Sequence, residues 1–129
     1  MNIIADTNIF LAVALDEPEK NRIIQLSAGM DVSAPEILPY AIGNALSAMI
    51  KRKQISHDEA LSAQSVASMI PVRLLSVDVQ ASLRLAIEFS IYAYDAYFLQ
   101  CAKSTSYPLL TLDKRMRQVA TELHIEILE

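Results

Sequence analysis

Short apolar segments alternate with longer amphipathic ones along the whole chain, and this alternation limits the folds that it can adopt. The short segments predict strands at residues 2–5, 31–35, 72–75, 108–112 and 125–128. The longer segments predict helices at residues 8–15, 17–29, 35–53, 56–70, 78–89, 94–104 and 113–123. Strands separated by helices pair in parallel through right-handed crossovers, with helices on both faces. We therefore predict an α/β fold, a three-layer α/β/α sandwich with a central parallel sheet of about five strands.

Length and composition are typical of one compact domain, which we predict to span residues 1–129. The apolar share of 53% and the charged share of 20% exclude an intrinsically disordered chain. We expect neither a secretion signal nor a membrane span, because Met1 is not followed by a basic segment and the apolar runs are short or interrupted. The single cysteine, Cys101, excludes an internal disulfide and predicts a small buried side chain in a cytoplasmic protein.

The net charge of −4 argues against proteins that coat nucleic acids through bulk positive charge. A local basic rim beside an acidic site is compatible with it. The cluster at residues 51–53 needs no partner, because cations are favourable at the end of a helix. The cluster formed by Lys114, Arg115 and Arg117 lies near the start of a helix, where the dipole does not account for it. This second cluster is our candidate for phosphate contacts, with a merely solvated helix as the alternative.

Three aspartates stand out because the segments around them are apolar. Asp6 follows the first strand, Asp113 ends the segment "PLLTLD", and Asp95 is the only charged residue between Glu88 and Lys103. Each aspartate taken alone could be a helix N-cap. Ligands bind at the carboxyl ends of the strands in a parallel sheet, and the three aspartates can converge there. We predict that Asp6, Asp95 and Asp113 share one site, with Thr111 close by.

Three clustered carboxylates repel one another and raise each other's pKa unless a cation lies among them. Mg²⁺ or Mn²⁺ fits oxygen ligands best, and such ions promote hydrolysis of phosphodiesters. Other catalytic designs lack their residues. The chain has only two glycines and therefore no phosphate-binding loop, and its two histidines and one cysteine make a poor zinc site. Asn8 stands where a dehalogenase-type phosphatase would have its second aspartate.

Four segments of the chain resemble motifs of the PIN-domain family, and within it of the VapC-type ribonuclease toxins of toxin–antitoxin modules. The segments are "IIADTNIF", "APEILPYAIGNAL", "YDAYFLQCA" and "LLTLDKRM", in the order that the family has them. The resemblance implies a PIN-like fold, a parallel sheet between helices. It also implies Mg²⁺- or Mn²⁺-dependent cleavage of RNA by four acidic residues.

Carried over residue by residue, three of the four acids are Asp6, Asp95 and Asp113. The supporting polar residues of the family match Thr7, Asn8, Asn44 and Thr111. The fourth acid is normally a glutamate three residues before the asparagine, and that position is occupied by Ala41, which cannot bind a metal. Glu36 lies five residues earlier near the helix start, faces elsewhere on the helix, and is not a replacement.

Two explanations of Ala41 remain open: a natural degenerate member that binds without cutting, and an engineered inactive variant of an active enzyme. Because the other motif residues are intact, we favour the second. Two function classes follow from them, a metal-dependent ribonuclease that is impaired in this copy, and an RNA- or protein-binding module.

The resemblance also implies partners. VapC-type toxins form homodimers and are held inactive by an antitoxin whose tail lies in a hydrophobic groove. We expect the helices at residues 35–53 and 56–69 to expose apolar side chains for such contacts. The expected substrate is single-stranded or structured RNA such as tRNA, because the acidic chain should bind duplexes weakly. We expect His57 to be an exposed first-turn residue behind a capping box formed by Ser56 and Glu59.

Overall fold

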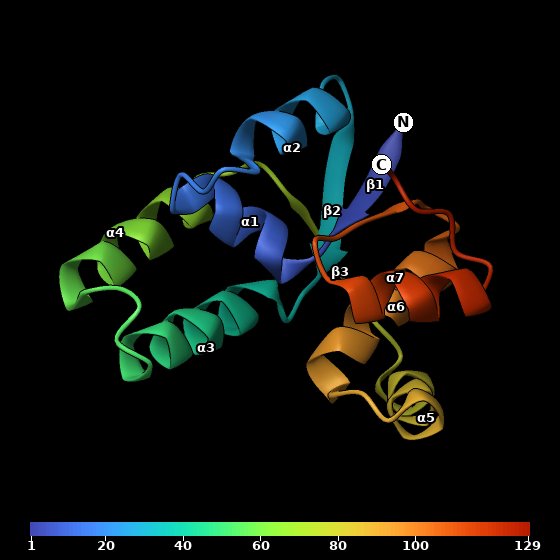
Figure 1. Ribbon diagram of the computed structural model, residues 1–129. Helices are drawn as coiled ribbons and strands as arrows, with labels where there is room; N and C mark the ends of the chain where they lie inside the picture. Colours follow the sequence, from blue (N-terminus) through green and yellow to red (C-terminus); the bar gives the residue numbers. More distant parts are fainter.

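The computed structural model describes all 129 residues and shows a sheet of four parallel strands in the order β3-β2-β1-β4 (Figure 1). The strands are β1 (Asn2–Ala5), β2 (Asp31–Pro35), β3 (Arg73–Leu75) and β4 (Leu109–Leu110). The helices are α1 (Thr7–Ala14), α2 (Lys20–Ser27), α3 (Leu38–Lys51), α4 (His57–Ser68), α5 (Val79–Phe89), α6 (Ala93–Thr105) and α7 (Lys114–Glu122). The predicted alternation of strands and helices is therefore confirmed.

Helices cover both faces of the sheet. One group, α1 to α4, packs together on one side, and α5 to α7 lie on the other (Figure 1). The central strand β1 is buried on both faces, and Ile3 and Ile4 are inaccessible to solvent. A continuous apolar run is what a parallel strand needs when helices cover it on both sides. The predicted three-layer α/β/α arrangement is confirmed, and none of the helices has the length and apolar character needed to cross a membrane.

The predicted fifth strand at residues 125–128 is reduced to a single parallel bridge between Leu109 and Ile127. Leu109 donates its N–H to the carbonyl of Glu126 at 2.8 Å, and its own carbonyl accepts the N–H of Leu128 at 2.9 Å. β4 contains only two residues, so only the N–H and the carbonyl of Leu109 are available to pair with a further strand. The sheet thus has four strands, one fewer than the number expected.

The helix predicted at residues 35–53 begins later, at Leu38, because Pro35 completes β2. Pro39 lies in the first turn, where a missing N–H costs no helical hydrogen bond. The capping box predicted for the next helix is confirmed. Ser56 Oγ accepts the N–H of Glu59 at 3.1 Å, and Glu59 Oε1 accepts the N–H of Ser56 at 3.0 Å. His57 is exposed behind it, as expected.

Parallel pairing brings the carboxyl ends of the strands to one edge of the sheet. Ala5 at the end of β1 pairs with Leu110 at the end of β4, so Asp6 and Thr111 emerge beside each other. The helices α1, α3 and α7 begin near this edge (Figure 1). This edge therefore holds the first residues after several strands and the first turns of the helices that follow them.

Candidate acidic site

Asp6 is a buried carboxylate at the point where β1 becomes α1. Its N–H continues the sheet by donating to the carbonyl of Leu110 at 3.0 Å. Its side chain then caps α1, because Oδ1 accepts the N–H of Thr7 at 2.8 Å. Only 4% of the residue is exposed, so the apolar run before it and the helix after it hold the carboxylate inside the protein. Thr7 supports the site through its backbone N–H.

A hydrogen-bonded network joins Asp6 to the end of β4. The Thr111 hydroxyl donates to Asp6 Oδ2 at 2.8 Å. Asn8 Nδ2 lies 3.3 Å from Thr111 Oγ1 and 3.4 Å from Asp6 Oδ2, and Asn8 Oδ1 accepts the N–H of Leu112 at 3.2 Å. Two neighbouring strands far apart in the sequence thus orient one carboxylate. Of the supporting residues taken from the sequence, Asn8 and Thr111 contact Asp6, whereas Asn44 is exposed on α3.

The three aspartates lie close enough to influence one another's ionisation. Burial raises the pKa of Asp6 to about 6, although the hydrogen bonds from Thr111 and Thr7 favour the carboxylate, and the charges of Asp95 and Asp113 raise this pKa further. Burial also raises the pKa of Asp95, and the charge of Asp113 adds to that effect. The structure therefore brings Asp6, Asp95 and Asp113 into one acidic cluster.

No basic side chain neutralises this cluster. The one ion pair of the structure joins Lys20 to Asp16, at 3.3 Å, and involves none of the three aspartates. Asp113 caps α7, because Oδ1 accepts the N–H groups of Arg115 at 2.7 Å and Met116 at 3.1 Å. The cap leaves the other oxygen of this exposed carboxylate without a partner. The side chain of Asp95, in the first turn of α6, accepts no hydrogen bond from the chain.

The donor chemistry of the cluster fits a hard cation, because oxygen ligands without a protein cation lie together. No three acidic, histidine or cysteine side chains are arranged to hold one ion directly. Mg²⁺ usually takes one or two carboxylates and completes its shell with water. Asp6, Asp95 and Asp113 could hold such an ion together with water molecules. Ala41 lies in the second turn of α3, is buried at 7% exposure, and offers no ligand atom.

The basic side chains on α7 differ in their contacts with the rest of the chain. Arg115 Nη2 donates to the carbonyl of Phe89 at 2.7 Å. Arg117 donates to the carbonyl of Thr111 from Nε at 3.3 Å and from Nη2 at 3.0 Å. Lys114 is exposed, and its ammonium makes no such contact. The sequence carries no signal for the two arginine contacts, because any residue type can supply a backbone carbonyl.

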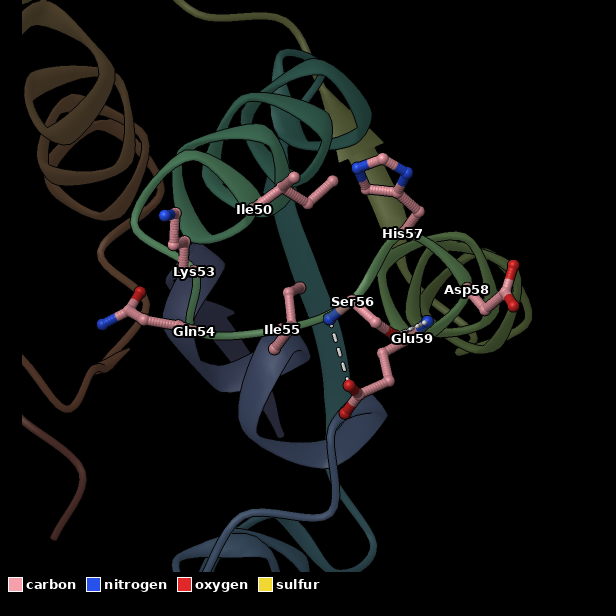
Figure 2. Close-up of a pocket in the computed structure, with 8 residues that line it drawn as sticks. All are labelled: Ile50, Lys53, Gln54, Ile55, Ser56, His57, Asp58 and Glu59. Carbon is pink, nitrogen blue, oxygen red and sulfur yellow. Dashed lines mark hydrogen bonds between the residues drawn. The ribbon is translucent and has the colours of Figure 1, made fainter.

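Two hollows on the surface were not expected from the sequence. The first lies at the turn between α3 and α4, where Figure 2 shows mostly polar side chains around the capping box, and it includes none of the three aspartates. The second is mainly apolar and lies between α3, α5 and α6. It is lined by Glu36, Ile37, Tyr40, Val77, Val79 and Tyr97. None of the three aspartates lines the second hollow.

Comparison with known proteins gives a family and a fold. A search of curated proteins finds no match. The crystal structure of PAE2754 from Pyrobaculum aerophilum superposes with a TM-score of 0.65 at 21% identity, covering 96% of this chain and 88% of that one. The crystal structure of VapBC2 from Rickettsia felis, bound to a DNA fragment from their promoter, gives a TM-score of 0.66 at 15% identity, covering 100% and 98%.

These two likenesses describe the fold. The family model of the PIN domain matches residues 3–122. These residues include all three aspartates, the network around Asp6 and most of the sheet. The chain belongs to the PIN-domain family.

Proposed function

We propose that this protein is a metal-dependent endoribonuclease of the VapC type, the toxin of a type II toxin–antitoxin module, and that Ala41 impairs or abolishes cleavage in this copy. The observation that carries the proposal is the buried carboxylate of Asp6, whose pKa is raised by the charges of Asp95 and Asp113 and which has no ion pair with a protein cation. The similar fold of VapBC2 supports the toxin assignment.

In this mechanism each residue has a defined task. Asp6, Asp95 and Asp113 would hold one or two Mg²⁺ or Mn²⁺ ions, which would supply a reactive water and stabilise charge on the phosphate. Thr111 and Asn8 fix the direction of Asp6 by the hydrogen bonds described above. The amides of α7 fix Asp113, which leaves its free oxygen for the ion or its water.

A binding module without turnover is the second candidate function, and Ala41 is the observation that favours it. The decisive assay restores a carboxylate at position 41 and measures whether the protein then cuts RNA with added metal. Cleavage would support the nuclease, and a folded but inactive protein would support the binding module.

We further propose that Lys114 contacts an RNA phosphate beside the acidic site, with the free donors of Arg115 and Arg117 assisting. The triple Ala variant should bind a structured RNA such as tRNA more weakly. The slope of log K against log salt should fall by about 2, since each single-stranded phosphate contact contributes about 0.7. Lys114→Ala alone should lower the slope by about 0.7. Lys103→Ala, which removes an exposed charge on α6, is the control, and an unchanged slope in the triple variant would make the cluster a solvated helix end.

Two protein partners belong to the proposal, a cognate antitoxin and a second copy of the chain. Exposed apolar side chains gather on α4 and α5 more than on α3, where Tyr40 is the exposed large one. On α5 they recur every four residues and form one stripe. The stripe consists of Val79, Leu83 and Ile87, which are 60%, 51% and 73% exposed. Such a stripe is typical of a helix that packs against another protein.

We expect the α5 stripe to form the homodimer contact. Leu83→Asp should therefore convert the protein from dimer to monomer, because a carboxylate would be buried without a partner at the centre of the contact. Sedimentation velocity over a range of concentrations measures the change. Leu61→Asp on α4, where leucine is 69% exposed, is the matched control and should leave the dimer intact. A parent protein that is monomeric at every concentration would disprove the dimer.

A further inference from the structure

Arg117 makes a contact that ties α7 to the strand end carrying Thr111. The residue lies in the first turns of α7, and its side chain returns to the carbonyl of Thr111, which it meets with two donors at 3.3 and 3.0 Å. Thr111 is 1% exposed, so its carbonyl depends on a partner within the protein. The guanidinium of Arg117 is the partner that the structure shows. Its positive charge is thus held by a backbone carbonyl and not by a carboxylate.

The hydroxyl of Thr111 faces the acidic site. Its hydroxyl donates to Asp6, accepts the N–H of Asp113 at 3.1 Å, and lies in reach of the Asn8 amide. Threonine is β-branched and has few allowed side-chain rotamers. The orientation of the Thr111 backbone therefore limits the directions in which the hydroxyl can point. A group that holds the Thr111 carbonyl thus helps to hold the hydrogen bond to Asp6.

We propose that Arg117 is a positioning residue of the acidic site. Its guanidinium holds the backbone of Thr111, and Thr111 in turn holds the Asp6 carboxylate in one orientation. This assignment gives Arg117 a task in addition to assisting the phosphate contact proposed for Lys114, whose ammonium makes no contact within the chain. The geometric part stands on the contacts within the chain, and its consequence for a bound metal rests on the proposed function.

Arg115 provides a matched control on the same helix. It also donates to a backbone carbonyl, at 2.7 Å, but that carbonyl belongs to Phe89 at the end of α5. Replacing either arginine with methionine removes one positive charge and one contact between α7 and a neighbouring segment. Only the contact of Arg117 leads to the acidic site. The two variants therefore separate positioning of Asp6 from a general role in holding α7.

The first readout is NMR of the metal-free protein, which measures the Thr111 side-chain rotamer by three-bond couplings and the Asp6 environment by its carboxyl carbon shift. Arg117→Met should change both signals, and Arg115→Met should change neither. Arg117→Lys, which keeps the charge and offers a single-nitrogen donor, should give a smaller change in the same direction. This conservative variant decides the question alone if Arg117→Met does not fold. Unchanged Thr111 and Asp6 signals in the folded Arg117 variants would overturn the proposal.

The second readout is the affinity for Mn²⁺ at neutral pH, measured by calorimetry without RNA. Arg117→Met should bind Mn²⁺ about 10-fold more weakly, since partners that orient a ligand typically contribute 10- to 100-fold to metal affinity. Arg117→Lys should recover part of this loss, and Arg115→Met should match the parent. Equal affinity in all folded variants would overturn the link between Arg117 and the site. If neither the parent nor the Ala41→Glu protein binds Mn²⁺, the proposed function fails, and the NMR comparison still decides the role of Arg117.

Discussion

The Ala41→Glu variant is expected to cleave a structured RNA with Mg²⁺ or Mn²⁺ at least about 100-fold faster than the chain with Ala41, by comparison with the loss of one group that stabilises transition-state charge. The reason is the place of Ala41 on α3, which begins near the edge of the sheet where Asp6 emerges (Figure 1). A carboxylate there would supply the ligand that the present site lacks. We also expect the variant to be toxic to its expression host.

Cleavage of tRNA with and without chelator measures the effect. The glutamine of Ala41→Gln has nearly the same size as glutamate but carries no charge. This variant should therefore remain inactive, and it separates metal ligation from an effect of packing. Ala41→Glu combined with Asp95→Asn should also be inactive, which excludes a contaminating nuclease. A folded Ala41→Glu protein that cuts no RNA with either metal, in the absence of antitoxin, would favour the binding module.

The metal-free protein is expected to lose stability as the pH rises toward neutrality, because Asp6 must ionise inside the protein. Its pKa is raised from 3.8 to about 6 in the folded state, so between these values the folded protein holds a proton that the unfolded chain has released. The free energy of unfolding therefore falls as pH increases through this window. The total penalty is about 3 kcal/mol above pH 6, of which about 1 kcal/mol develops between pH 5 and pH 7. The raised pKa of Asp95 acts in the same direction.

Urea unfolding at pH 5 and pH 7 with chelator measures this loss. Asp6→Asn keeps the shape of the side chain without its charge, so this variant should lose most of the pH dependence. Added Mn²⁺ should stabilise the parent at pH 7, by about 3 kcal/mol at 100 times its dissociation constant, and should not stabilise the variant equally. A parent that is as stable at pH 7 as at pH 5 without metal would contradict the burial of an ionising Asp6.

The sequence predicts the site best where a local rule and the sheet topology agree. Asp6 and Thr111 each follow an apolar run, and parallel pairing of those runs is enough to place them side by side. The convergence of Asp95 with them needed the packing of α6 on the sheet, which its sequence position alone suggests weakly. The metal and RNA roles of these residues stay predictions.

Other features depend on contacts that leave no pattern in a single sequence. Arg117 meets a backbone carbonyl, and its sequence neighbours do not distinguish it from Lys114. The apolar hollow near Tyr97 arises from three helices meeting, which no single segment encodes. The last apolar run reads as a strand, yet the brevity of β4 limits it to one bridge. Pro35 reads equally as a helix start and as the end of a strand, and pairing with Leu75 decides for the strand.

The hydrogen bond between Thr111 and Asp6 joins residues separated by 105 positions. The acidic site can therefore form only after both of these residues have been synthesised. The first strand, followed by Asp6, is synthesised before its neighbour β4, which precedes Thr111 and Asp113. Until β4 follows, Asp6 has neither the Thr111 hydroxyl nor the charge of Asp113 beside it. A nascent chain that ends before β4 therefore carries a capped aspartate without a completed acidic site.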